Sequence, residues 1–513
     1  MSRIPRSARG LIAATAVTAA VVALTGCTTA ADDSSRLVIA LDSDQAALGY
    51  DPLRYGNGQR MFFEGLYDSL FVLDETGAVV PDLVTDFSYN YDNTELTLDL
   101  DTSVTFDDGT ALSADLVKQN LDARDNKELS AYNGFATDGA TPIGDVTVVD
   151  DDTVTLTFPA ASEGFESNLV FPAGVIVGPT GAADRSSLDT APDGSGPLQL
   201  DADATVKGNT YLLTKKEGRD DAADYPFDSY EFRPILDPQA RVNAVVSGDA
   251  DIAYVTAATK DQVTSAGKEL LVNGGTVYNL LPFDKNGSVV PAFANADVFR
   301  ALSMAIDRET LINAIHPGER PTASVLPLDN PGYDAELEDA FAYDPDAAKE
   351  LLASAGYPDG FELVVTVSSD SQRDWEAIQP YFEAIGVDVT LQNASSTEEF
   401  FAAVQTTGIG GPIPLTWSNP AGNVFGVLFG FANYHNAENG AIQGAMGAVL
   451  GAQDDASRAD ALKGLNDAIA QSGWLIPLYE QEANWGYDTA KVSGATFPGA
   501  DAFPTLSTIT PAS

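Results

Sequence analysis

A run of alternating helix and strand signals between residues 295 and 391 constrains the fold of this chain most. Asp344 followed by Pro345 is a strong helix start, because aspartate caps free N–H groups and a proline in the first turn has none to cap. Four residues then recur at helical spacing: Ala348, Leu351, Leu352 and Ala355. Gly356 can end this helix, and residues 361–367 follow as a strand. Such α/β units predict a largely parallel sheet with helices on its faces.

The N-terminus has the pattern of an export signal. Arginines precede an apolar stretch over residues 11–24, which falls short of the ~20 residues that a membrane-spanning helix needs. The sequence Leu-Thr-Gly-Cys follows, ends at Cys27 and resembles a bacterial lipobox, in which the chain is cut before a cysteine that then carries a lipid. We therefore expect a signal peptide over residues 1–26, lipid attachment at Cys27 and a tether over residues 27–35. An ordinary signal peptide beside an incidental cysteine is the alternative.

Charge and residue types exclude several classes of function. The 513 residues include 27 Lys and Arg against 75 Asp and Glu, a net charge of −48, which would repel nucleic acids and anionic lipids. Beyond Cys27 no thiol remains, and the two histidines occur without Gly-x-Ser-x-Gly or His-Glu-x-x-His. We expect no catalytic residue, no metal site and no cofactor. A secreted hydrolase or a surface sensor is the alternative from another class.

Five segments carry motifs in a fixed order along the chain. They are residues 74–83 (Asp-x-x-Gly-x-x-x-Pro-x-Leu), 104–115 (Val-x-Phe-x-Asp-Gly with Ala-Asp), 194–197 (Gly-Ser-Gly-Pro), 300–308 (Arg-Ala-Leu-Ser-Met-Ala-Ile-Asp-Arg) and 343–361. Together they resemble family 5 extracellular solute-binding proteins, the peptide, nickel and related receptors of ABC importers. The resemblance covers nearly all of the chain after Cys27.

The resemblance implies a periplasmic-binding-protein-like α/β fold of two lobes joined by a hinge, with an extra N-terminal subdomain. The expected division is as follows: 36–79, first part of lobe I; 80–184, inserted subdomain; 185–277, second part of lobe I; 278–479, lobe II; 480–513, return to lobe I. Such a protein would be a monomer, lipid-anchored on the outer face of the plasma membrane. It would enclose a small solute as its lobes close and deliver that solute to an ABC permease.

The nature of the ligand stays open. Peptide binders of this family hold the ligand's α-amino group with an aspartate just after a tryptophan. Here Trp417 is present, but Ser418, Asn419 and Asn423 stand where the acid is expected. Either Trp417 and the asparagines bind a neutral solute such as an oligosaccharide or a capped peptide, or Trp417 is core and another acid, such as Asp284, binds the amine. Other candidate ligand residues are Phe283, Tyr254 and Tyr55.

Overall fold

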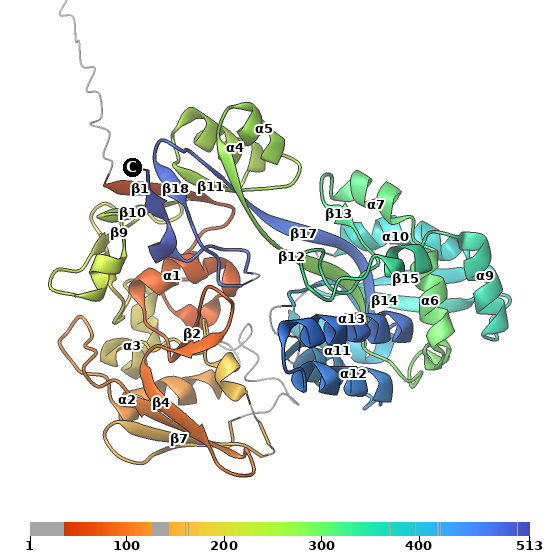
Figure 1. Cartoon of the computed structure of the whole chain (residues 1–513), viewed down its shortest axis with the longest axis horizontal. Helices are drawn as coiled ribbons and strands as arrows, with labels where there is room; N and C mark the ends of the chain where they lie inside the picture. The colour runs from red at the N-terminus through yellow and green to blue at the C-terminus, as the bar shows by residue number, and fades with distance from the viewer. Residues whose placement is uncertain are drawn as a thin grey trace, which may run out of the picture. The chain divides into compact units, whose positions relative to one another are not determined.

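The computed structural model describes residues 35–125, 143–159, 161–162, 164–368, 371–395, 397–417, 420, 422–499 and 501–512 (Figure 1). Cys27 and the expected signal peptide lie outside the described residues, as do Ser418 and Asn419. None of the helices in the described residues combines the length and the apolar character needed to cross a bilayer.

The largest element is a nine-stranded mixed sheet with the order β16-β12-β17-β11-β1-β10-β9-β8, in which β13 also pairs with β17. Its strands are β1 (Arg36–Leu41), β8 (Leu198–Leu200), β9 (Tyr211–Lys215), β10 (Ser229–Pro234), β11 (Ile252–Val255), β12 (Glu269–Pro282), β13 (Arg320–Pro321), β16 (Ile409–Leu415) and β17 (Ile476–Tyr487). The strand β1 is parallel to both β10 and β11, whereas β17 is antiparallel to both β11 and β12. The two longest strands, β12 and β17, run side by side over almost their whole length (Figure 1).

The predicted parallel sheet of the second half is wrong in its extent. Only β14 (Phe361–Val367) and β15 (Val387–Asn393) pair in parallel there. The strands β12, β16 and β17 pair antiparallel, because β12 enters this part of the chain and β17 leaves it in the opposite direction. Alternating helix and strand signals reveal the local units, but they do not reveal two long strands that connect distant segments.

Some of the α-helices begin after a side chain that caps them, and others begin without such a cap. They are α1 (Arg60–Leu66), α2 (Ala114–Asp122), α3 (Pro179–Ala183), α4 (Pro238–Ser247), α5 (Lys260–Ser265), α6 (Ala296–Met304), α7 (Arg308–Ile315), α8 (Glu336–Ala340), α9 (Pro345–Ser354), α10 (Gln372–Ala384), α11 (Thr397–Thr407), α12 (Gly440–Leu450) and α13 (Asp455–Ser472). The predicted cap of α9 is confirmed, since Asp344 Oδ1 accepts a hydrogen bond from Ala347 N at 2.9 Å. Gly356, just past this helix, has a φ of +102°, as expected for a helix-ending glycine.

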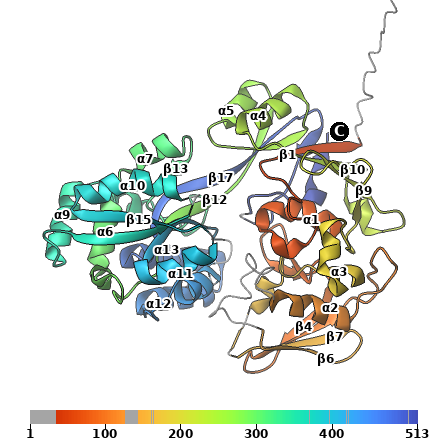
Figure 2. The same ribbon diagram turned by 180° about the vertical axis from the view of Figure 1, so that it is seen from behind.

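A separate four-stranded antiparallel sheet has the order β4-β5-β7-β6. Its strands are β4 (Val84–Tyr89), β5 (Glu95–Leu100), β6 (Asp145–Val148) and β7 (Thr153–Thr157). Strands β6 and β7 form a hairpin in which Val148 pairs with Val154. Helix α2 packs against β6 and β7 (Figure 2), and this part of the chain has its own hydrophobic core between Leu70 and Ile176. Two short hairpins complete the strands: β2 (Phe71–Leu73) with β3 (Val79–Pro81), and β18 (Val492–Gly494) with β19 (Thr510–Pro511).

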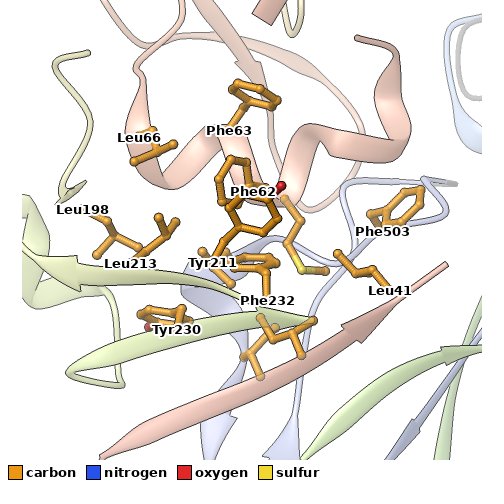
Figure 3. Close-up of a cluster of buried hydrophobic side chains, with 14 of the residues drawn as sticks. Leu41, Phe62, Phe63, Leu66, Leu198, Tyr211, Leu213, Tyr230, Phe232 and Phe503 are labelled. Carbon is orange, nitrogen blue, oxygen red and sulfur yellow. The ribbon is translucent and has the colours of Figure 1, made fainter. Parts of the chain in front are cut away.

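The hydrophobic cores join segments that lie far apart in the sequence. In the first core, Phe62 of α1 packs edge-on against Tyr211 and Phe232, and Phe503 from the C-terminal segment joins the same cluster (Figure 3). Two further clusters lie between Leu280 and Tyr479. The strand β17 contributes one end to the first core and the other end to the second, so it connects the two. The expected domain boundaries stay a prediction.

Candidate ligand-binding site

Three aromatic rings meet where β11, β17 and the C-terminal segment come together. Tyr254 pairs with Trp485 in the register of β11 and β17, and their rings meet edge-on with centroids 5.6 Å apart. The Tyr254 ring also stacks on Phe503, with centroids 5.8 Å apart and an interplanar angle of 21°. Trp485 is fixed by a hydrogen bond from its Nε1 to Ala502 O at 2.9 Å. Tyr254 remains partly exposed, so this cluster offers an aromatic edge to solvent.

A second stacked pair lies farther along the same ladder. Tyr278 of β12 is in register with Tyr479 of β17, and their rings are nearly parallel at 7° with centroids 4.6 Å apart. His316 stacks on Tyr479 at 4.4 Å, and its Nε2 lies 2.6 Å from Asp374 Oδ1. Tyr278 and His316 are half-buried, whereas Tyr479 is buried. We call Tyr254, Tyr278, Tyr479, Trp485 and Phe503 the aromatic row.

A short chain of hydrogen bonds leads from the aromatic row to a carboxylate. Tyr278 Oη donates to Gln481 Oε1 at 3.2 Å, and Gln481 Nε2 donates to Glu319 Oε1 at 3.4 Å. Burial raises the pKa of Glu319 from its ordinary 4.5 to about 7, against the lowering effects of Gln481, His316 and Lys260. Glu319 therefore carries a readily neutralised charge in a partly buried place.

The charge of Glu319 affects the pKa of three tyrosines in the aromatic row. Burial is the main cause that raises the pKa of Tyr254, Tyr278 and Tyr479, and the negative charge of Glu319 raises all three further. Hydrogen bonds through Gln481 and the stacking of Tyr278 on Tyr479 also connect Glu319 with two of these rings, so we treat the groups as one candidate site. It combines aromatic faces, an amide and a carboxylate, which suits a polar solute bound by stacking, hydrogen bonds and charge.

Of the residues predicted from the sequence, Tyr254 belongs to this site, and Tyr55 and Phe283 occupy interior positions. The Tyr55 hydroxyl accepts a hydrogen bond from Leu48 N and donates one to Gly49 O, both at 2.7 Å, so it closes its own loop. Phe283 is fully buried and packs in the third core with Phe400 and Tyr434. The role of all three residues in ligand binding stays a prediction.

Asp284 has an evident local role. It is fully buried, and its carboxylate accepts backbone hydrogen bonds from Ser288 at 2.9 Å, Val289 at 2.8 Å and Val290 at 2.7 Å. These bonds close the turn after β12 and engage both carboxylate oxygens. The binding of a ligand amine by Asp284 stays a prediction that this geometry does not favour.

The segment around Trp417 is described only in part. Trp417 is 2% exposed and packs in the third core, while its Nε1 has no hydrogen-bond partner among the described residues. Asn423 Nδ2 donates to Thr416 O, which closes this segment on itself. Trp417 therefore occupies an interior position, and which of the two alternatives for ligand binding holds stays a prediction.

Several members of the site were not singled out from the sequence: Tyr479, Trp485, Phe503, His316, Glu319 and Gln481. One signal was available, because Tyr278 and Tyr479 mark the two ends of the expected second lobe and such crossings carry the site. No sequence signal distinguishes Glu319 from the other 74 acids. Within the described part of the chain, no group of three or more His, Cys, Asp or Glu side chains is placed to hold a metal ion.

Comparison with known proteins identifies the class of this chain. Residues 78–437 match the family model described as bacterial extracellular solute-binding proteins, family 5 Middle. The protein belongs to this family, and the resemblance drawn from the motifs is confirmed.

Individual relatives agree with this assignment. The chain is 28% identical over 352 residues to the glutathione-binding protein GsiB of Pectobacterium atrosepticum, a match that covers 67% of this chain and 66% of GsiB. The chain thus spans about two thirds of the length of the curated relatives it matches.

Solved structures show the same fold. The binding protein AgaA of A. tumefaciens R10, solved with agropinic acid, has a TM-score of 0.69 at 23% identity and covers 93% of this chain and 98% of its own. DppA of Helicobacter pylori, solved with the peptide STSA, has a TM-score of 0.69 at 18% identity with the same coverage. The expected two-lobed periplasmic-binding-protein-like α/β fold, with its extra N-terminal subdomain and hinge, is confirmed.

Proposed function

We propose that this protein is a receptor that captures a small peptide or peptide-like solute and delivers it to the permease of an ABC importer. The observation that carries the proposal is the site itself: Tyr278 of β12 and Gln481 of β17, which link to Glu319 by hydrogen bonds, lie on the two long strands, and β17 connects the two main cores. A solute bound there would contact both lobes and favour their closure, which is a hinge motion. The relatives named for glutathione and the neighbour solved with a peptide support a ligand of this kind.

The proposal involves binding without chemistry and places the protein outside the cytoplasm. The family comprises extracellular solute-binding proteins, and the Leu-Thr-Gly-Cys sequence supports lipid attachment at Cys27 on the outer face of the membrane. In this arrangement the protein is a monomer, and its two lobes contact the permease after they have closed on the solute.

A neutral solute such as an oligosaccharide is the second candidate ligand. It is favoured by the sequence between residues 408 and 434, which has no acid where the family's amine-binding aspartate is expected.

A thermal-shift screen tests the proposal. The chain from residue 28 onward, stripped of bound solute by unfolding and refolding, is screened with glutathione, free and N-acetylated tripeptides, oligosaccharides and nickel chelates. A ligand at about 100 times its Kd should add roughly 2.7 kcal/mol of stability and raise the Tm. Turnover of an ester, peptide or glycoside without any binding shift would contradict the proposal and favour a hydrolase.

A further inference from the structure

Glu319 differs from the acids near it in having no basic side chain within ion-pair distance among the described residues. Neighbouring acids each have a basic side chain of their own: Glu480 and Glu338 contact Arg320, Glu482 lies 3.0 Å from Lys260 Nζ, and Asp374 lies 2.6 Å from the His316 imidazole Nε2. Across the described ranges, by contrast, no Lys, Arg or His nitrogen lies within ion-pair distance of Glu319. The nearby Lys260 and His316 act on Glu319 only from a distance, and Glu482 opposes them.

This arrangement is costly in the ligand-free protein. A partly buried carboxylate loses hydration, and it recovers this loss only through a cation or several hydrogen bonds. Among the described residues, the Glu319 side chain has one long hydrogen bond, from Gln481, to one of its two oxygens. The raised pKa of this carboxyl is the expected consequence of that poor compensation.

The surroundings of Glu319 would suit a cation. Tyr278 is half-buried and its ring stacks on Tyr479, and the faces of tyrosine rings attract ammonium and guanidinium groups. The Tyr254 ring, by contrast, already stacks on Phe503 and has the guanidinium carbon of Arg241 6.0 Å from its centroid. The Tyr278 hydroxyl is committed to Gln481, which orients both side chains relative to the carboxylate. An aromatic surface beside a carboxylate without a cation of its own is an arrangement that a cationic ligand completes.

We propose that the solute captured by this protein carries a cationic group, and that Glu319 binds this group beside the ring of Tyr278. This inference rests on the proposed receptor function and specifies its ligand. Glu319 thereby supplies the negative charge that the segment around Trp417 lacks. The cation is an ammonium or guanidinium group, contributed either by a free peptide N-terminus or by a basic side chain.

Isothermal titration of the full chain tests the proposal with matched probes. Trialanine and N-acetyl-trialanine differ in the N-terminal amine, and N-acetyl-Ala-Arg-Ala and N-acetyl-Ala-Gln-Ala differ in the side-chain cation. We expect the wild type to bind one cationic probe at least tenfold more tightly than its neutral match, and the preferred pair identifies the source of the cation. Glu319→Gln should weaken the cationic probe at least tenfold and change binding of the neutral match less than twofold.

Glu166→Gln is the matched control. Glu166 is also partly buried and also accepts a hydrogen bond from an uncharged side chain, that of Tyr89 at 2.5 Å, but it lies by the four-stranded sheet. This control should leave the affinity of every probe unchanged.

The outcomes separate this inference from the proposed function. Binding of neutral and cationic probes with equal affinity, insensitive to Glu319→Gln, would overturn the inference and leave the receptor function standing. Binding of none of the peptides, the oligosaccharides or the chelates would overturn both. An equal loss of both members of a pair in Glu319→Gln would show a merely structural role and would also overturn the inference.

Discussion

Replacing Glu319 by Gln should stabilise the ligand-free protein at pH 8. The folded-state pKa of Glu319 is raised from 4.5 to about 7, so the contribution of this group to stability is fully present below 4.5 and is lost as the pH rises through about 7. The rise of this pKa from 4.5 to about 7 corresponds to a loss of folding stability at high pH of roughly 3.4 kcal/mol at most. Because Glu319 is partly exposed and water screens its charge, we expect about 1–2 kcal/mol. Glutamine does not ionise and escapes this loss.

Differential scanning calorimetry at pH 4 and pH 8 measures the effect. At each pH we compare the Tm of Glu319→Gln with that of the wild type. For a chain of this size, this Tm difference should be about 1–3 °C larger in favour of the variant at pH 8 than at pH 4. Glu166→Gln controls for the loss of one negative charge from a chain with a net charge of −48. A lower Tm for Glu319→Gln at pH 8, or an equal change at both pH values, would refute the reasoning, since the fold would then stabilise the charged carboxylate.

Three further predictions concern affinity, folding and location. Affinity for a cationic probe should fall up to roughly 30-fold when the titration is done at pH 5.5 instead of pH 8, because Glu319 with a pKa of about 7 becomes protonated. The same dependence of affinity on pH in Glu319→Gln would contradict this. Asp284→Asn should lower the free energy of unfolding in urea by about 2–4 kcal/mol. The carboxylate accepts hydrogen bonds from three backbone N–H groups with both of its oxygens, whereas an amide has only one oxygen and cannot accept from all three. A loss below about 0.5 kcal/mol would rule out that role. Cys27→Ser should move the protein from the membrane fraction to the soluble fraction on immunoblots, whereas retention in the membrane fraction would argue against lipid attachment.

Sequence reasoning succeeded where the determining interactions are local. The N-cap at Asp344 and the left-handed Gly356 depend on residues within one turn of the helix, and both were predicted. The family motifs likewise mark turns and helix starts, so they identified the fold although each motif alone is modest.

The site could not be predicted in the same way because its contacts are not local. The stacking of Tyr278 on Tyr479 depends on a strand register between residues about 200 positions apart. The burial of Glu319 and the absence of a cation beside it, within the described residues, depend on how neighbouring acids take the few available lysines and arginines. Trp417 is a related case. A tryptophan at this place in a family motif can either stack on a solute or fill a core, and the sequence does not distinguish the two.

The contact of Trp485 with Tyr254 gives the protein a built-in optical reporter. Of the four tryptophans, three belong to the two cores between Leu280 and Tyr479: Trp375, Trp417 and Trp474. Trp485 is the one tryptophan in the aromatic row, and its ring centroid lies 5.6 Å from that of Tyr254 and 5.8 Å from that of Phe503. A solute that settles on Tyr254 would alter the surroundings of this indole, so its emission would follow the arrival and departure of ligand without an added label, and Trp485→Phe would silence the signal.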